Sequence, residues 1–417
     1  MSKKLLVILY TFPPFPGVGG RRWAKFSKYL AQRDYNIHVL CSENPYKEQS
    51  LWVNDVKHSQ IKTHILPVNY PGVMLHGAKS MFDKISYRLW KIYFSMYSKG
   101  VVFERTMFWE KQLLQKASSL IEQEGITNLI VSIPPYRLGS YSIKLKQKYP
   151  HINFIVDYRD PWTDNKSFHG FKDISTSRLT YEKEIENNLI ASADSIVSVS
   201  NDMTKDLKTR SIKPEKVITI PNGYDPDDIM PDKKVTKTDV IKFVYAGTLY
   251  NDLEYIITPL INYLKKLKAE GNEIFTRLQF EFYGSINAEL KEKLITANLG
   301  CVLINAAVPL NEMQKILNDS SFCILITPPD YSVVFNTKFC EYLANRKPII
   351  LFTYPCESSD FLVANKLGFH INPANIESDL NKFFSEMDNV IANFNYAFDL
   401  TPFSVPYLTS QIEKLLK

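Results

Sequence analysis

The chain has 417 residues, more than a single hydrophobic core usually spans, so two domains are expected. Hydrophobic residues make up 45% and charged residues 23%, as in an ordinary globular protein, and no apolar run is long enough to span a bilayer. The formal net charge of +6 is too small to indicate nucleic-acid binding, but it is compatible with an anionic ligand or an anionic membrane surface.

The N-terminal segment begins with a short apolar run, predicted to be a strand, and continues through prolines into "GVGGRRW". Residues 21–31 carry apolar side chains at helical spacing, and residues 37–41 are predicted to be the next strand. Gly19, Gly20 and Arg21 at a helix N-terminus favour an anion site, because free N–H groups and the positive dipole end point the same way. The spacing is neither a dinucleotide fingerprint nor a P-loop, so a flexible connection with exposed arginines remains the alternative.

Predicted strands and helices alternate along the rest of the chain. Strands are expected at 5–10, 37–41, 61–67, 129–132, 154–157, 195–200, 217–220, 241–246, 278–283, 302–304, 323–326, 348–352 and 368–371. Helices are expected at 21–31, 110–124, 138–148, 177–191, 253–269, 311–318, 337–345 and 377–391. This alternation predicts an α/β protein with two doubly wound domains in series, whose ligand lies at the carboxyl ends of both sheets, in the cleft between them.

The domain boundaries follow from a change of composition. Residues 225–239 are polar, contain two prolines and have almost no apolar periodicity, so they are predicted to be a linker. We expect an N-terminal domain over 1–224 and a C-terminal domain over 240–394. The C-terminal segment and helix, 395–417, are expected to return to the N-terminal domain.

Five phrases occur in a characteristic order: "GVGGRRW", "DYRDPWTDN", "IPNGYD", "FVYAGTL" and "NTKFCEYLANRKPII". With them the chain resembles the GT-B glycosyltransferases of the family-4 type, retaining enzymes that use sugar nucleotides to build bacterial surface polysaccharides. The resemblance covers nearly the whole chain, and the PNGxD and EYLAxxKP phrases are its most specific parts. It implies two Rossmann-like domains, the first on the acceptor side and the second binding the nucleotide sugar, and no bound metal.

The expected donor site lies mainly in the second domain. Asn336 is a good N-cap for the helix over 337–345, and Lys338 lies in its first turn, where the dipole disfavours a cation unless an anion is bound nearby. Glu341, one turn on, is suited to accept hydrogen bonds from a ribose diol. The alternative is an exposed Lys338 with Glu341 paired to a neighbour. The expected donor-binding residues are Gly19, Gly20, Arg21, Gly247, Thr248, Asn336, Thr337, Lys338 and Glu341.

The chain departs from the family pattern in two places. Val333 stands where the family usually carries an acid, and backbone amides of residues 334 and 335 are expected to replace that contact to the donor sugar. The usual Arg and Lys are also missing from "AGTLYNDLEY". The donor phosphates are therefore expected to be held by Lys338, the helix N-terminus and the Arg21–Arg22 pair.

The "DYRDPW" phrase places charged side chains at the carboxyl edge of the first sheet, where α/β sites lie. Asp160 and Arg159 are the predicted catalytic residues: Asp160 orients or deprotonates the acceptor, and Arg159 positions a phosphate or Asp160 itself. Pro135 and Tyr136, at the end of the preceding strand, are predicted to contact the acceptor. A structural Arg–Asp pair that holds the loop is the alternative.

Residues 79–100 predict a helix with an apolar stripe and many cations. Its aromatic side chains and its excess of cations over acids are typical of an interfacial helix that rests on anionic lipid. A helix packed inside the first domain is the alternative. The stripe consists of Phe82, Ile85, Leu89, Ile92 and Met96, and the expected membrane contacts are Lys84, Arg88, Trp90 and Lys91.

The sequence thus predicts a glycosyltransferase that moves a sugar from a nucleotide diphosphate donor to a saccharide acceptor, expected to be lipid-linked, in surface polysaccharide assembly. No metal is expected, since no His/Cys cluster has ligand spacing. No nucleic-acid partner is expected because the net charge is small, and the resemblance implies no cofactor besides the nucleotide-sugar substrate. Five scattered cysteines favour reduced thiols in the cytoplasm, with the protein peripheral at the inner face of the cytoplasmic membrane. The alternatives are a GT-B sugar-nucleotide epimerase and a degenerate transferase acting as a scaffold.

Overall fold

The computed structural model describes residues 3–164, 171, 174–230, 239–328 and 335–417. The chain divides into two compact units: unit 1 comprises Met1–Pro221 with Val405–Lys417, and unit 2 comprises Asn222–Ser404. Residues 231–238 of the predicted linker, Val333 and Val334 lie outside the described residues. Among the described helices, none has the length and apolar character needed to cross a membrane.

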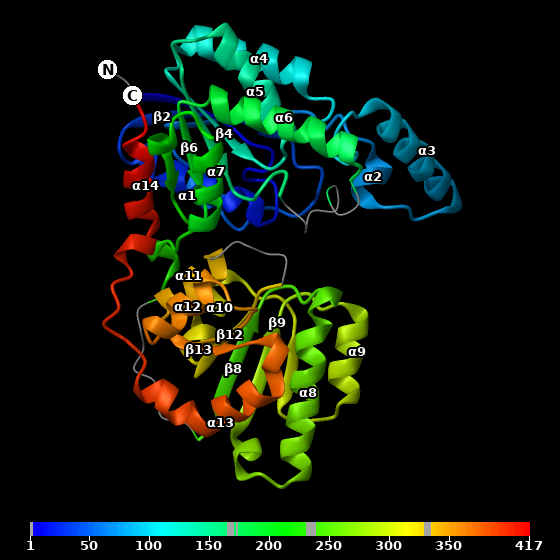
Figure 1. The fold of residues 1–417 in the computed structure, drawn as a ribbon, viewed down its shortest axis with the longest axis vertical. Coiled ribbons are helices and arrows are strands. Elements are labelled where there is room, and N and C mark those ends of the chain that lie inside the picture. The colour runs from blue at the N-terminus through cyan, green and yellow to red at the C-terminus, as the bar shows by residue number, and fades with distance from the viewer. Residues whose placement is uncertain (1–2, 165–170, 172–173, 231–238, 329–334) are drawn as a thin grey trace. The chain divides into compact units, whose positions relative to one another are not determined.

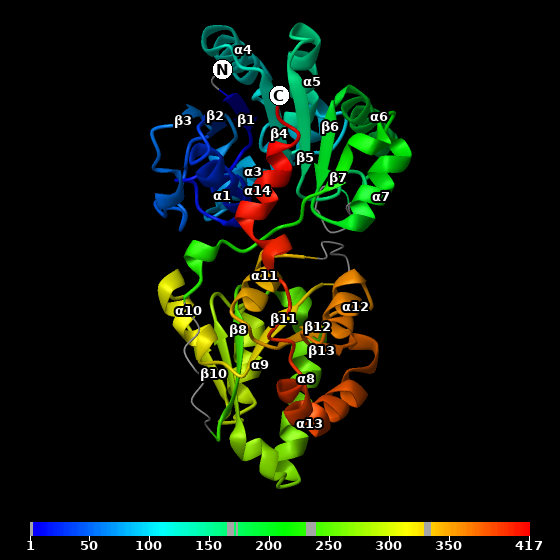
Figure 2. The same cartoon turned by 90° about the vertical axis from the view of Figure 1, so that its left-hand side faces the viewer.

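The sheet of unit 1 is parallel, with the strand order β3-β2-β1-β4-β5-β6-β7 (Figures 1 and 2). Because the chain runs outward from β1 and then from β4, the order reverses between these two strands, and a doubly wound sheet binds ligands at such a switch point. The described strands are β1 (Lys3–Ile8), β2 (Tyr35–Ser42), β3 (Ile61–Leu66), β4 (Asn128–Ile133), β5 (Asn153–Tyr158), β6 (Ser195–Ser198) and β7 (Val217–Thr219).

Helices cover both faces of this sheet. The described helices of unit 1 are α1 (Arg21–Ala31), α2 (Gly72–His76), α3 (Met81–Tyr97), α4 (Glu110–Glu124), α5 (Arg137–Lys148), α6 (Thr176–Ser192), α7 (Asn201–Arg210) and α14 (Val405–Glu413). Trp23 of α1 and Leu408 of α14 share one core cluster with Val7 of β1, while α4 and α5 contact the strands from the other side. Figure 2 shows the C-terminal helix α14 beside α1, so the last residues of the chain complete the core of unit 1.

Unit 2 repeats this architecture with the strand order β10-β9-β8-β11-β12-β13, and its switch point lies between β8 and β11. Successive residues of β8 point to opposite faces: Phe243 packs with α8, α9 and α13, and Val244 packs with α11 and α12. The strands are β8 (Ile241–Ala246), β9 (Leu278–Tyr283), β10 (Val302–Asn305), β11 (Phe322–Ile326), β12 (Ile349–Phe352) and β13 (Gly368–Ile371). The helices are α8 (Glu254–Ala269), α9 (Ala288–Thr296), α10 (Leu310–Asn318), α11 (Thr337–Ala344), α12 (Glu357–Ala364) and α13 (Ile376–Ala392).

The predicted fold class, α/β with two doubly wound units, is confirmed. Four observed helices, α2, α7, α9 and α12, were not predicted; α7, for example, buries only Met203, Thr204 and Leu207, which gives too weak an apolar period. The cysteines are free thiols, with Cys356 partly exposed and the other four buried.

Candidate functional site

Two glycines meet at the carboxyl edge of the sheet in unit 2. Gly247 follows β8 with φ 150°, and Gly284 follows β9 with φ 126°, a region of backbone conformation that favours glycine. The Gly247 N–H donates to the Tyr283 carbonyl oxygen at 2.8 Å. A Cβ on Gly284 would lie 2.3 Å from the carbonyl oxygen of Gly247, so the two loops leave no room for a side chain.

Lys338 is brought against this pair of loops by the start of α11. Asn336 caps that helix as predicted: its Oδ1 accepts a hydrogen bond from the Phe339 N–H at 2.9 Å. A Cβ on Gly247 would lie only 1.9 Å from Lys338 Nζ, so the ammonium lies directly against the glycine Cα. The same Nζ lies 5.2 Å from the ring centroid of Tyr245, a cation–π contact.

The Lys338 ammonium is half-buried, and no hydrogen bond or ion pair within the described part of the chain reaches it. Burial lowers the pKa of Lys338, and the charge of Glu341 partly opposes that shift. The alternative of a freely exposed Lys338 therefore does not hold. Half-buried Thr248 and Thr337 lie at the ends of the same two segments.

This arrangement is suited to an anion. Glycine backbone that can be approached closely, free N–H groups at a helix N-terminus and a desolvated cation all lie at the topological switch point of unit 2. Gly284 and Tyr245 were missed by the sequence analysis. A lone glycine after a predicted strand was the only available signal for Gly284.

In unit 1, the packing of their own loop leaves little room for side chains at Gly19 and Gly20. A Cβ on Gly19 would lie 2.7 Å from Thr11 Oγ1, and one on Gly20 would lie 3.0 Å from the Thr11 carbonyl oxygen. Close packing thus accounts for the glycines without a ligand, and their contact with the donor stays a prediction. Arg21, which follows them at the start of α1, is buried with 3% of its surface exposed.

Arg22 has a structural role, which corrects the expectation that it holds phosphate. Its Nη2 pairs with Asp157 Oδ1 at 3.1 Å and donates to the Ile220 carbonyl oxygen at 2.8 Å. Asp157 is fully buried and also accepts a hydrogen bond from Trp23 Nε1 at 2.7 Å. The buried pair therefore ties α1 to β5 and to the end of unit 1, and leaves no free charge for a ligand.

Arg159 and Asp160 follow β5 and, unlike Arg22 and Asp157, form no ion pair with each other in the described structure. The Arg159 guanidinium donates from Nη1 to the Gly19 carbonyl oxygen and from Nη2 to the Pro134 carbonyl oxygen, so it joins the loops on both sides of the switch point. Asp160 is half-buried, and within the described residues its carboxylate has no hydrogen bond. Burial raises the pKa of Asp160, opposed by the Arg159 charge. Arg159 therefore holds two loops together, the Asp160 carboxylate is left without a hydrogen bond among the described residues, and the catalytic role of both stays a prediction.

Tyr136 packs against the loop that follows β5. Its ring is 1% exposed and stacks on Trp162 with centroids 5.0 Å apart, and its hydroxyl donates to the Pro161 carbonyl oxygen at 2.5 Å. A side chain so buried offers no surface to an acceptor, which corrects the predicted contact for Tyr136. Pro135 is half-exposed, and its acceptor contact stays a prediction.

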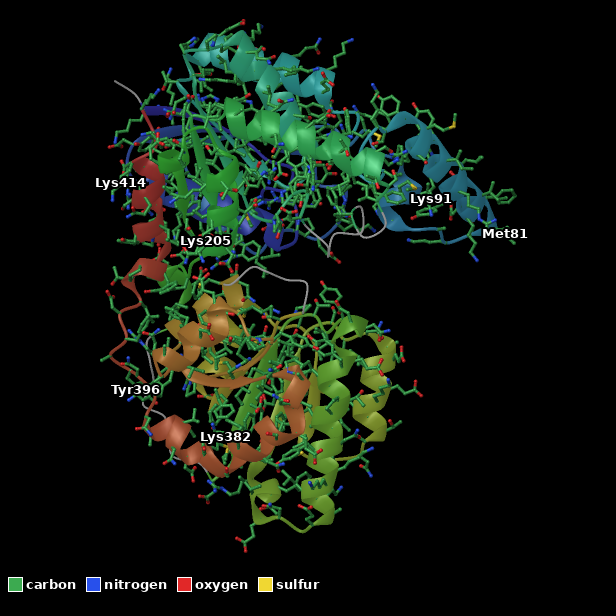
Figure 3. The ribbon with its side chains drawn as sticks, viewed as in Figure 1. Met81, Lys91, Lys205, Lys382, Tyr396 and Lys414 are labelled. Carbon is green, nitrogen blue, oxygen red and sulfur yellow. The ribbon has the colours of Figure 1, made fainter. Side chains whose placement is uncertain are left out.

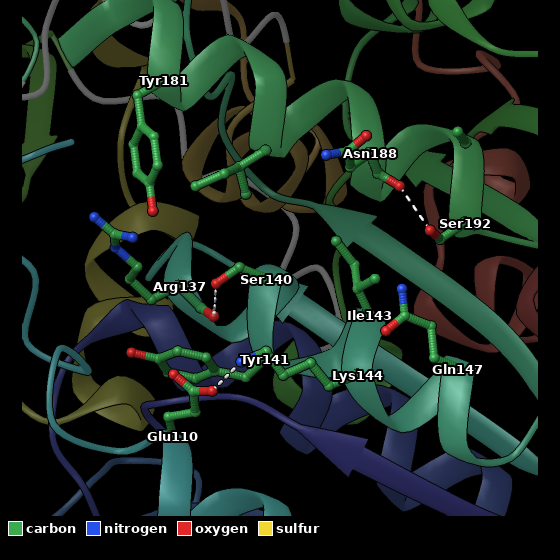
Figure 4. Close-up of a pocket in the computed structure, with 12 residues that line it drawn as sticks. Glu110, Arg137, Ser140, Tyr141, Ile143, Lys144, Gln147, Tyr181, Asn188 and Ser192 are labelled. Atoms are coloured by element: carbon green, nitrogen blue, oxygen red, sulfur yellow. Dashed lines mark hydrogen bonds and ion pairs between the residues drawn. The ribbon is translucent and has the colours of Figure 1, made fainter. Parts of the chain in front are cut away.

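The predicted interfacial helix is α3, on which Figure 3 labels Met81 and Lys91. Its basic residues Lys84, Arg88 and Lys91 are exposed, while Trp90 is half-buried. A pocket of about 530 Å³ also lies in unit 1, between α5 and α6 (Figure 4). It runs along the outer helices from Arg137 to Gln147 and not along the carboxyl edge. Its charged groups are paired within the protein, Lys144 with Glu110 and Arg137 with Glu182, so we do not assign it to the site.

Residues 111–228 match the family model of Glycosyltransferase Family 4. This matched segment contains the strands β4 to β7 and includes Asp160. The chain resembles the family-4 GT-B glycosyltransferases. A comparison with curated proteins finds none that matches in sequence.

Solved structures of glycosyltransferases share the fold over nearly the whole chain. Sucrose-phosphate synthase from Thermosynechococcus elongatus superposes with a TM-score of 0.65 at 11% identity, covering 99% of this chain and 98% of that one. WaaG, a glycosyltransferase involved in lipopolysaccharide biosynthesis, gives 0.59 at 12% identity and 99% coverage of both chains. HepE from Anabaena, solved with UDP-glucose, gives 0.62 at 12% identity, covering 99% of this chain and 98% of that one. At such identities the likeness shows the GT-B fold.

Proposed function

We propose that the protein is a glycosyltransferase that transfers a sugar from a nucleotide diphosphate donor to a saccharide acceptor. The family match and the fold support a nucleotide-sugar glycosyltransferase. The observation that carries the assignment of the donor site is the half-buried ammonium of Lys338, held against Gly247 at the N-terminus of α11 without a protein anion bonded to it in the described residues.

In this proposal the donor diphosphate binds at Lys338 and the N-terminus of α11. As the bond between the anomeric carbon and the phosphate oxygen breaks, negative charge grows on the leaving nucleoside diphosphate. A fixed cation and helix N–H groups stabilise that charge more strongly in the transition state than in the ground state, which accelerates transfer. Glu341 accepts hydrogen bonds from the ribose, and Thr248 and Thr337 contact the phosphates. This charge stabilisation requires no metal ion.

On the acceptor side, Asp160 orients the attacking hydroxyl and takes its proton as the new bond to the anomeric carbon forms. A carboxylate with a raised pKa and no competing hydrogen bond from the described residues is suited to this role. From the family resemblance we propose retention of configuration at the transferred sugar, with the acceptor hydroxyl attacking from the face that the diphosphate leaves. We also propose a lipid-linked saccharide acceptor, a role in surface polysaccharide assembly, and a location at the inner face of the cytoplasmic membrane.

The experiment is a donor screen with and without acceptor. The chain is incubated with a panel of nucleotide sugars, nucleoside diphosphate release is measured, and the recovered donor is analysed by NMR. The proposal predicts release that is stimulated by a saccharide acceptor. Interconversion of the donor sugar without acceptor would instead indicate an epimerase, and donor binding without any turnover would indicate a scaffold; either result would contradict the proposal.

A further inference from the structure

We infer that α3 docks unit 1 on an anionic phospholipid surface. The apolar residues that would be the core face of an ordinary helix are turned to solvent: Phe82 is 84% exposed, Met96 is 83% exposed and Leu89 is 62% exposed. Ile85 and Ile92 are more than half exposed as well. These five residues, the apolar stripe, lie within an arc of about 80° at the helical repeat and extend over about 21 Å of helix. The alternative in which this stripe packs inside the domain is wrong.

The helix is folded and attached to unit 1 through a different face. Phe94 is fully buried, with its ring 5.2 Å from that of Tyr70 and 5.9 Å from that of Phe108. At the N-terminus, Ser80 and Asp83 form a capping box. Arg178 of α6 holds the C-terminal end by donating to the carbonyl oxygens of residues 95, 98 and 100. The exposed stripe therefore belongs to a helix that is anchored to unit 1 at its margin, beside α2 (Figure 1).

The charges beside the stripe identify the occupant. Lys84, Arg88 and Lys91 are exposed, form no ion pair with any described residue, and project from an arc of about 60° next to the stripe. The one acid of the helix, Asp83, is engaged in the capping box, where it accepts a hydrogen bond from the Ser80 N–H at 2.8 Å. A surface that is apolar in its interior and anionic at its boundary matches this pattern, as the acyl and headgroup layers of an anionic bilayer do.

A second copy of the chain fits less well. Two such helices packed through their stripes would bring two sets of unpaired cations together, which charge repulsion disfavours. Tyr93 and Tyr97, 46% and 55% exposed, lie toward the edge of the stripe, where amphipathic rings sit at headgroup depth. The docking surface is thus defined as the apolar stripe, these two tyrosines and the three cations.

This inference deepens the proposed function, because a docked unit 1 would meet a lipid-linked acceptor at the surface where that acceptor lies. Its test does not need the transferase activity. The purified 417-residue chain is co-sedimented with vesicles of phosphatidylglycerol and phosphatidylcholine, and with vesicles of phosphatidylcholine alone. We expect binding to the anionic vesicles that weakens with added salt, and much weaker binding to the neutral vesicles.

Two variants, each with a matched control, make the test specific. Lys84/Arg88/Lys91→Glu should lower vesicle affinity by at least about 100-fold, because each cation near the surface contributes roughly fivefold. Lys265/Lys291/Lys382→Glu makes the same charge change on exposed lysines of unit 2 and should have a far smaller effect. Phe82/Met96→Ser should also abolish binding, whereas Ile212/Ile295→Ser, at sites that are 72% and 60% exposed, should not.

Three outcomes would overturn the inference. They are no binding of the wild type to anionic vesicles, equal loss in the charge-matched control, and concentration-dependent dimers without lipid that disappear in Phe82/Met96→Ser. Because all substituted side chains are exposed, near-UV circular dichroism should show the variants to be folded. Normal donor turnover without vesicle binding would refute the docking surface alone, and vesicle binding without donor turnover would refute the proposed function alone.

Discussion

At the scale of single residues, the two half-buried charges of the candidate site differ from the buried charges around them in having no hydrogen bond among the described residues. Arg22 and Asp157 satisfy each other, and such a pair fixes structure. Lys338 and Asp160 have no hydrogen-bonded partner in the described ranges. Burial disfavours the charged form of both side chains, so the pKa of Lys338 is lowered and the pKa of Asp160 is raised. Groups kept in this condition are candidates for ligand binding and catalysis.

Asp160→Asn tests the role of the free carboxylate. The substitution keeps size and removes the base, so we expect transfer to fall by about 100-fold or more while donor affinity stays unchanged. The measurement is kcat for transfer together with the calorimetric Kd of the donor. Asp164→Asn, at a nearby exposed acid, is the control. Unchanged transfer in Asp160→Asn would show that Asp160 only holds the loop.

His64 gives unit 1 a pH-dependent stability. Its Nε2 lies 3.0 Å from His38 Nδ1, and burial, followed by the charge of His38, lowers the pKa of His64 to about 4. A histidine with a pKa below its unfolded value of about 6.5 binds protons more readily when unfolded. The free energy of unfolding should therefore be maximal above pH 6.5 and fall by on the order of 1–3 kcal/mol between pH 6.5 and 4 on account of His64.

Urea unfolding at several pH values checks this prediction. His64→Gln should flatten the pH dependence in that window, whereas His151→Gln, at an exposed histidine, should leave it as in the wild type. The same slope in wild type and His64→Gln would mean that the histidine pair does not titrate with folding.

At the scale of elements, regular structure was predictable because it depends on local pattern. The bounds of β8, β9 and α4 agree with the sequence analysis, since apolar residues with turn signals on both sides define them. The cap at Asn336 was predictable for the same reason. The contact of Lys338 with Gly247 was not, because it joins α11 to β8, two elements that become neighbours only through the sheet order. The burial of Tyr136 depends likewise on Trp162, which stacks on it from another strand's loop.

Gly247→Ala tests that junction of elements. The new methyl group would clash with Lys338 Nζ, so Lys338 must move. The φ of Gly247, 150°, also favours glycine, so alanine would be strained there. We expect donor affinity to fall by about tenfold or more, with a loss of stability of about 1–2 kcal/mol. Calorimetry with the donor and urea unfolding measure the two effects. Gly271→Ala, at a positive-φ glycine with open space around it, is the control for backbone strain. A similar small loss of affinity in both variants would contradict the assignment.

At the scale of the whole molecule, the chain leaves unit 1 at Pro221 and returns to it with Val405. The returning helix α14 buries Leu408 in the core shared with α1, and Arg33 of unit 1 donates to the Pro406 carbonyl oxygen at 2.9 Å. The stability of unit 1 therefore depends on the last residues of the sequence. The predicted return of residues 395–417 placed the whole segment with the N-terminal domain, whereas residues 395–404 lie in unit 2.

Leu408→Ala should destabilise unit 1 selectively. Removing a fully buried leucine side chain costs about 2–5 kcal/mol. Hydrogen exchange measured at increasing urea concentration reports the unfolding of each unit. The urea midpoint for β1 in unit 1 should fall, while the urea midpoint for β8 in unit 2 should not. Lys414→Ala, at an exposed position of the same C-terminal segment, should have no effect. Equal protection of β1 in both variants would contradict this dependence on α14.

The central claim is that Lys338 binds the donor diphosphate, and donor affinity measured by isothermal titration calorimetry tests it most directly. Lys338→Met keeps the chain length over Tyr245 and removes the charge, and Lys291→Met is the exposed control. We predict that Lys338→Met weakens donor binding by about 10- to 100-fold, as expected for loss of a charge-assisted hydrogen bond worth about 1.5–3 kcal/mol. It should also be at least as stable as the wild type without ligand, because a desolvated charge is removed. Lys291→Met should bind like the wild type. Equal donor affinity in Lys338→Met and the wild type would contradict the account.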